Sequence, residues 1–114
     1  PLPTESLPMF VILTSKPGQY RTVPSADIEL LEAWDYLFYG RLQAQFVIGK
    51  LLRETKVQVV EEDASGTVNR VPSKFLERFD TLAQAHAELQ HLCNFGSLDA
   101  QLISVPLPQA AASA

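Results

Sequence analysis

Short apolar runs separated by turn residues make up most of the chain, and this pattern predicts a protein built mainly from β-strands. The run MFVIL is apolar at every position, which is typical of a central strand that is buried on both faces. The later runs alternate apolar and polar positions or are rich in β-branched residues. We expect strands at residues 9–13, 20–23, 44–52, 56–63 and 100–105.

The residues between these runs predict how the strands are connected. The segment KPGQ at residues 16–19 has Pro and Gly at its two central positions, which predicts a type II turn, after which the second run pairs back. A polar turn at residues 53–55 joins the third and fourth runs into a hairpin. Turn residues dominate residues 63–74, which we expect to form the longest loop of the domain.

One segment, residues 81–92, repeats its apolar residues at the spacing of a helix. Its apolar stripe recurs at i, i+3, i+7 and i+10 and consists of Leu82, Ala85, Leu89 and Leu92. Thr81 followed by Gln84 matches the capping-box pattern at a helix start. The sequence therefore predicts an amphipathic helix that packs on the sheet and stops at the NFG segment, residues 94–96.

The stretch WDYLFYGR at residues 34–41 has two interpretations. As a strand, it places Trp34, Tyr36 and Phe38 on one face and Asp35, Leu37, Tyr39 and Arg41 on the other. As the end of a helix that begins near Ser25, it would bury a stripe containing Trp34 and Phe38. The strand is favoured, and its first face is expected mainly to build the core.

Together these patterns predict a single α+β domain over residues 9–105. We expect an antiparallel sheet of about five or six strands with the main helix, residues 81–92, on one face. A helix within residues 25–41 would instead give a ferredoxin-like βαββαβ order. Residues 1–8 are expected to be an extended or disordered tail and residues 106–114 a flexible tail. Exposed sheet edges in so small a domain favour a homodimer.

Charge and cysteine content exclude several classes of function. The net charge is −4 and Lys and Arg do not cluster, so we expect neither nucleic acid nor a membrane surface as a partner. The longest apolar run, residues 9–13, is far too short to span a bilayer. A single cysteine, Cys93, excludes an intramolecular disulfide and a four-thiolate metal site, and it fits a cytoplasmic location.

The two histidines and the cysteine are candidate metal ligands or nucleophiles, but their spacing favours neither role. His86 falls near the apolar side of the predicted helix and His91 on the opposite side, so they cannot share a metal ion. Glu88 and His91 have the Glu-x-x-His spacing of di-iron bundles, but the chain offers no second such pair. We expect His86 to be a boundary residue with a local hydrogen bond, and Cys93 to be a small apolar side chain.

A site built without a recognisable motif is the remaining possibility. The sequence contains no P-loop, no dinucleotide-binding glycine motif, no G-x-S-x-G and no H-E-x-x-H. Small α+β proteins can instead bring tyrosine, arginine, lysine and aspartate side chains to an apolar cleft. The candidate ligand-binding residues are Tyr20, Arg21, Asp35, Tyr39, Arg41 and Lys74.

Several segments together resemble a group of small proteobacterial proteins that are loosely labelled ferredoxin and that are associated with aromatic-compound degradation. They are MFVILTSKPGQYRT, WDYLFYGRLQAQFVIGKL, ETKVQVVEED, VPSKFLERFDTL and the following helix, so the resemblance covers residues 9–105. One cysteine and two histidines cannot hold an iron–sulfur cluster, whatever the label implies. The strand followed by KPG also resembles YCII-like proteins, which are small ferredoxin-fold dimers.

These observations give three expectations for function, none of which requires a cofactor or a metal. The first is a non-catalytic accessory or small-ligand-binding protein, serving an aromatic-degradation or oxygenase pathway as the resemblance implies. The second is a cofactor-free enzyme, such as an isomerase, lyase or hydrolase, acting on an aromatic or anionic metabolite. The third is a module that docks on a larger enzyme.

Overall fold

The computed structural model describes residues 9–92 and 100–107. The tail expected at residues 1–8, the helix stop at residues 94–96, Cys93 and the C-terminal residues 108–114 lie outside this described part. The strands are β1 (Phe10–Ser15), β2 (Tyr20–Val23), β3 (Ile28–Phe38), β4 (Arg41–Leu51), β5 (Lys56–Glu61), β6 (Val68–Pro72), β7 (Arg78–Phe79) and β8 (Ala100–Val105). The helices are the 3-10 helix η2 (Ser73–Phe75) and the α-helix α1 (Leu82–Leu92).

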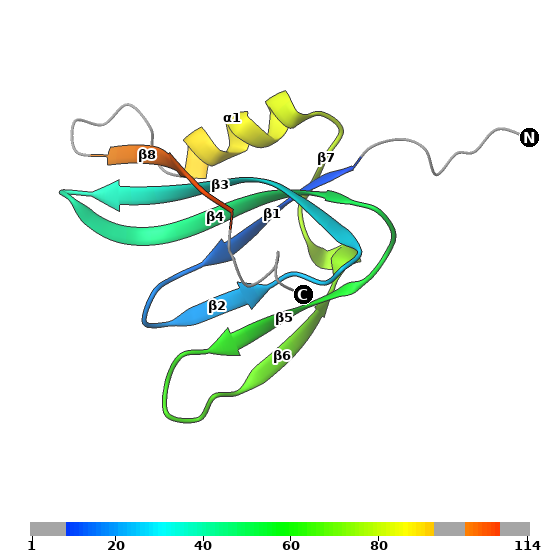
Figure 1. Cartoon of the computed structure of the whole chain (residues 1–114), viewed down its shortest axis with the longest axis horizontal. Coiled ribbons are helices and arrows are strands. Elements are labelled where there is room, and N and C mark those ends of the chain that lie inside the picture. Colours follow the sequence, from blue (N-terminus) through cyan, green and yellow to red (C-terminus); the bar gives the residue numbers. More distant parts are fainter. Residues whose placement is uncertain (1–8, 93–99, 108–114) are drawn as a thin grey trace, which may run out of the picture.

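The strands form two antiparallel sheets, which together with α1 make three layers. The order is β7-β1-β4-β3-β8 in the five-stranded sheet and β2-β5-β6 in the three-stranded sheet. α1 packs on one face of the five-stranded sheet, and the three-stranded sheet packs on the other face (Figure 1). The predicted α+β class, with one helix on one face of an antiparallel sheet, is confirmed, and the second sheet is an addition to it.

Each face of the five-stranded sheet has its own core. The core under α1 consists of the buried residues Ala44, Phe46, Ile48, Ala85 and Leu89. The core between the two sheets consists of the buried residues Val11, Leu13, Ile28 and Val57. β1 lies between β7 and β4 and supplies residues to both cores, so the prediction that the MFVIL run is a central strand is confirmed.

A register shift in β3 decides which of its side chains face α1. Leu30 pairs with Gly49, but the next paired residue of β3 is Glu32, which leaves Leu31 as an extra residue. Because side chains alternate along a strand, one extra residue moves all later side chains to the opposite face. Leu30 therefore packs toward the three-stranded sheet, whereas Trp34 packs on the core under α1.

The strand interpretation of residues 34–41 is confirmed as far as Phe38, and the helical alternative, with its ferredoxin-like βαββαβ order, is wrong. β3 pairs with β4 on one side and with β8 on the other, so its aromatic residues lie on a sheet face and not along a helix. Ser25 does not cap a helix, because its Oγ accepts a hydrogen bond from the Asp27 backbone N–H at 3.1 Å within a turn.

The expected hairpin between residues 44–52 and 56–63 is wrong. β4 and β5 follow each other along the chain, but β4 pairs with β1 and β3, whereas β5 pairs with β2 and β6. Backbone groups of the connecting segment bond to other parts of the chain: Leu52 N–H donates to the Asp27 carbonyl and Ser73 N–H to the Thr55 carbonyl. The chain therefore crosses from one sheet to the other at this turn.

The prediction that residues 63–74 form one long loop is also wrong, because this segment contains β6 and the start of η2. β6 pairs with β5 along its whole length, from Val68 to Pro72. This strand is hard to detect in the sequence, because two polar residues follow Val68 and the apolar positions do not alternate. In the structure Val68 itself is half-exposed. Pro72 is tolerated since β6 is the outer strand of its sheet.

The predicted type II turn and the predicted helix are confirmed. Gln19 N–H donates to the Lys16 carbonyl at 2.9 Å, and Gly18 has a φ of 80°. Beyond that turn, however, β2 pairs with β5 and not with β1. At the start of α1, Gln84 N–H donates to Thr81 Oγ1 at 3.1 Å, while the Gln84 side chain accepts from the Asp80 N–H. The apolar stripe ends earlier than expected, because Leu92 is 48% exposed.

The Ser73→Ala substitution is expected to lower the free energy of unfolding by about 1–3 kcal/mol. Ser73 is fully buried, and its Oγ donates to Glu54 Oε1 at 2.6 Å while accepting from the Thr55 N–H at 2.9 Å. Truncation would leave the Thr55 N–H without this acceptor. Chemical denaturation should show this loss but only a small change for Ser104→Ala, since Ser104 is exposed. Equal effects would contradict the assignment.

Candidate functional site

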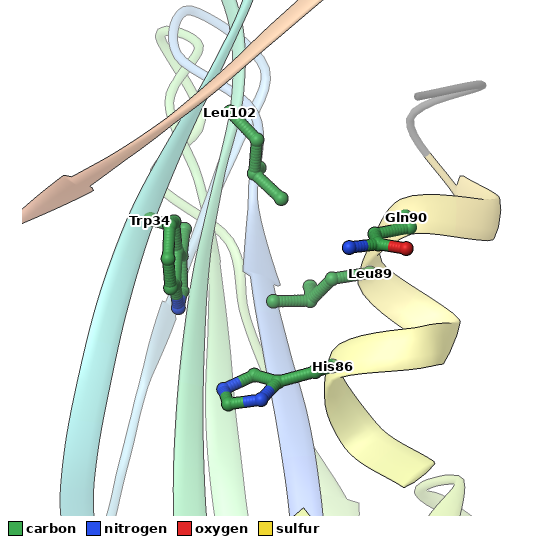
Figure 2. A pocket seen from close by; sticks show the side chains of 5 residues that line it. All are labelled: Trp34, His86, Leu89, Gln90 and Leu102. Atoms are coloured by element: carbon green, nitrogen blue, oxygen red, sulfur yellow. The ribbon is translucent and has the colours of Figure 1, made fainter. Parts of the chain in front are cut away.

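A groove of about 300 Å³ lies between α1 and the neighbouring strands β3 and β8. Its lining residues are Trp34, His86, Leu89, Gln90 and Leu102. Figure 2 shows Trp34 and Leu102 on the side of the sheet, and His86, Leu89 and Gln90 projecting toward them from α1. The surface of the groove is therefore mostly apolar, with one amide and one imidazole among its walls.

The fold brings these residues together through two features. After the extra residue in β3, Trp34 faces α1, and the pairing of Tyr36 with Leu102 puts the Leu102 side chain on the same face. His86, Leu89 and Gln90 are spaced by three and four positions, so they share the face of α1 that meets the sheet. The groove thus depends on the register of β3 as much as on the helix.

Glu32 holds the two aromatic rings of the groove in place. Its Oε1 accepts one hydrogen bond from Trp34 Nε1 at 3.0 Å and a second from His86 Nε2 at 2.6 Å. An indole N–H only donates and an ionised carboxylate only accepts, so Nε2 of His86 carries the proton in this pair. The rings of Trp34 and His86 meet edge to face, with their centroids 6.2 Å apart.

The Glu32 carboxylate is a negative charge bonded to two lining residues of this groove. Partial burial acts to raise the pKa of Glu32, but the hydrogen bonds from His86 and Trp34, together with the charge of a protonated His86, outweigh burial and lower it. The carboxylate is therefore ionised at neutral pH. Within the part of the chain that the structure describes, no lysine or arginine lines the groove.

The lowered pKa of Glu32 predicts a pH-dependent contribution to stability. A carboxyl whose pKa is lower in the folded state stabilises it above the unfolded pKa, and this stabilisation is lost as the pH falls through the folded value. The difference in free energy of unfolding between the wild type and Glu32→Gln should therefore shrink between about pH 6 and about pH 3.

Denaturation of the two proteins across this pH range makes the comparison. Hydrogen bonds also lower the pKa of Glu54 and Asp63, but both groups are present in the two proteins, so the difference reports on Glu32 and its bonded partners. Glu29→Gln, on the exposed side of the same strand, is the matched control. A difference that stays constant with pH would contradict the role of the Glu32 hydrogen bonds.

The candidate residues of the three-stranded sheet and of η2 lie away from this groove. Tyr20 and Arg21 are on β2, and Arg21 Nε lies 3.7 Å from a carboxylate oxygen of Glu62. Lys74 is on η2, where its Nζ lies 5.6 Å from the centre of the Phe75 ring. Lys74 also lines a second, more open depression with Glu54, Thr55, Lys56 and Pro72.

The other candidates lie at or near the turn between β3 and β4. Tyr39 is 69% exposed at this turn, with a positive φ of 52°, and Arg41 is exposed beside it. Asp35 Oδ1 accepts a hydrogen bond from Gln45 Nε2 at 3.2 Å. Among the described residues, no hydrogen bond or ion pair joins any two of the six candidates. Their role in ligand binding stays a prediction.

The histidines differ as the sequence suggests. His86 is a boundary residue with a hydrogen-bonded partner, although that partner comes from β3 and not from its own helix. His91 is exposed. Within residues 9–92 and 100–107, no three His, Cys, Asp or Glu side chains are grouped so as to hold a metal ion. The same residues contain no helix with the length and apolar character needed to cross a membrane.

Sequence analysis did not identify Glu32, Leu89, Gln90 or Leu102 as parts of a site, and it assigned Trp34 to the core. One signal was available: Glu32 is a charged residue between apolar neighbours, two positions before the single tryptophan of the chain. Its meaning depends on the register of β3, which the alternation of residues did not reveal.

Comparisons with known proteins do not assign a function. No protein family model matches the chain, and neither a curated protein nor a solved structure matches it. The resemblance to the ferredoxin-labelled group and to YCII-like proteins stays an expectation. The groove and the residues around it are therefore the observations from which a function is inferred.

Proposed function

We propose that this protein is a non-catalytic binder of a small aromatic molecule, and that the groove between α1 and β3 is its binding site. The observation that carries the proposal is the fixed Trp34 ring. Its Nε1 donates to Glu32 at 3.0 Å, while Leu89 and Leu102 line the same groove. A planar apolar ligand can stack on an indole that is already held in position, so that little side-chain freedom is lost on binding.

The experiment is a titration of intrinsic fluorescence. Trp34 is the single tryptophan, so its emission reports on this groove alone. Small aromatic compounds are expected to change the emission with saturation, and the Leu102→Phe variant, which narrows the groove without adding a second tryptophan, should weaken that response. Linear or absent changes across an aromatic panel, with the fold intact by circular dichroism, would contradict the proposal.

A cofactor-free enzyme is the second candidate, and the His86–Glu32 pair favours it. A carboxylate that accepts a hydrogen bond from an imidazole orients the ring and supports a positive charge on it, as general acid–base catalysis requires. Turnover of an aromatic substrate that is lost in Glu32→Gln and in His86→Gln, with ligand binding retained, would support this function. Binding without turnover would favour the binding protein.

We further propose that the protein serves an aromatic-degradation or oxygenase pathway, as the resemblance over residues 9–105 implies.

We also propose that β8 is the edge through which the protein forms a homodimer. β8 is an outer strand of six residues with neither a charge nor a proline, whereas β7 at the opposite edge has two residues. Charged residues, prolines and short strands are the usual protections of an edge.

Self-association through β8 should be sensitive to Ile103, which is 44% exposed on this strand. Sedimentation is expected to show a dimer for the wild type and a monomer for Ile103→Lys, because a lysine disfavours pairing of sheet edges. Ser104→Ala is the matched control on the same strand. A wild type that is monomeric at all concentrations would contradict the dimer, and co-purification with a larger enzyme would favour the docking function.

A further inference from the structure

We propose that the groove selects neutral aromatic molecules and discriminates against aromatic carboxylates. This inference rests on the proposed function, because it concerns the ligand of the same groove. It narrows the expectation from sequence, which left aromatic and anionic ligands open together. Three properties of the groove carry it: the sign of its charge, the chemistry of its lining residues and the position of its amide.

The charge beside the groove is negative. Glu32 contacts both Trp34 and His86 through the same oxygen, so its carboxylate is bonded directly to two of the lining side chains. Its side chain is 29% exposed, which means that water screens this charge less than at an open surface. A ligand carboxylate would enter this field with the same sign.

Among the described residues, the lining offers an anion neither a lysine nor an arginine, and its one imidazole, His86, is already bonded to Glu32 through Nε2. Leu89, Leu102 and Trp34 present apolar atoms or an already bonded N–H, and the arginine and lysine candidates lie on β2, on η2 and at the β3–β4 turn. Moving a carboxylate from water into such a place loses hydration without replacing it. A neutral ring loses much less hydration and gains the contact with the indole.

Gln90 supplies the polar contact that a neutral ligand can use. Figure 2 shows its amide at the rim of the groove, above Leu89 and facing the side of β3. Among the described residues it has no hydrogen-bond partner, and an amide can both donate and accept. A ring that carries an amide or a hydroxyl group therefore finds complementary hydrogen bonding next to an apolar wall.

Benzamide and benzoate test this selectivity, because they have the same ring and nearly the same size but differ in charge. Isothermal titration calorimetry at neutral pH is expected to give benzamide an affinity at least about ten-fold higher than that of benzoate. Gln90→Lys places a cation at the rim and should raise the affinity for benzoate. Ala83→Lys adds the same charge seven residues earlier, at an exposed position of α1 outside the lining. This control variant should not raise the affinity for benzoate.

The outcomes separate the two proposals. If both compounds bind with equal affinity, or if benzoate binds more tightly, the selectivity is overturned while the proposed binding function stands. If neither binds, and the panel of aromatic compounds gives no response of Trp34 fluorescence, the proposed function fails and the selectivity fails with it. Glu32→Gln adds an independent readout: with the carboxylate removed and the fold intact, the difference between the two affinities should narrow.

Discussion

Leu89→Ala is expected to lower the free energy of unfolding by about 2–5 kcal/mol, which is the largest effect that we predict for a single substitution in this chain. Leu89 is 1% exposed and packs in the core under α1 with Phe46 and Ile48. Truncation removes buried apolar contact and leaves a cavity that the surrounding sheet cannot fill completely. Urea denaturation followed by circular dichroism measures the loss.

Leu92→Ala provides the matched control, because it makes the same chemical change three positions later on the same helix. Leu92 is 48% exposed, so its truncation should cost well under about 1 kcal/mol. Equal losses in free energy of unfolding would contradict the orientation of α1 in which Leu89 is buried and Leu92 is exposed. Leu89→Ala should also widen the groove, so aromatic ligands should bind this variant more weakly than they bind Leu92→Ala.

Gly49→Ala is expected to destabilise the protein by about 1–3 kcal/mol, although alanine is the smallest possible addition. A Cβ built at position 49 would lie 2.5 Å from Ile28 Cγ2 and 3.3 Å from the Glu29 carbonyl oxygen. Gly49 is buried on β4, where it pairs with Leu30 of β3 next to the register shift. The cost therefore comes from crowding and not from backbone conformation.

Ile28→Leu tests this explanation, because leucine lacks the branch at Cβ that carries the crowding methyl group. The double variant Ile28→Leu with Gly49→Ala should lose less stability than the sum of the two single variants. Thermal or chemical denaturation of the four proteins completes the cycle. Strict additivity would show that crowding between residues 28 and 49 is not the cause of the destabilisation by Gly49→Ala.

The sequence contains the information for elements whose residues interact locally. The helix was predictable because its apolar spacing and the Thr81 cap lie within one segment. The turn at Gly18 was predictable for the same reason. The MFVIL strand was predictable because both of its faces are covered, so that nearly every position is apolar.

Pairings between distant segments were not predictable in the same way. β4 and β5 look like a hairpin, because they are adjacent strands joined by a polar turn, yet their partners lie elsewhere in the chain. β6 was missed because it is a short outer strand with polar residues on its exposed positions. Which strands pair depends on the apolar surface that both cores bury together, and a short segment of sequence does not contain this information.

The candidate site was the least predictable feature, because its residues come from three elements. Trp34 was predicted to lie on a core-building face of its strand, and the structure packs it on the core under α1. Its partner Glu32 lies two positions earlier and shares its face by alternation, and both residues face α1 because Leu31 is an extra residue in β3. Charged candidates such as Arg21 and Lys74 attracted attention by residue type, but the apolar groove lies elsewhere.

The central claim is that a neutral aromatic ligand occupies the groove beside Trp34. The most direct measurement is the ¹H–¹⁵N correlation spectrum, in which the single tryptophan gives one indole N–H signal. That N–H is bonded to Glu32, at the edge of the groove. Benzamide is expected to shift this signal progressively to saturation, together with the Gln90 side-chain signals, while benzoate has little effect. An indole signal that stays in place while benzamide shifts other regions, or shifts nothing, would contradict the account.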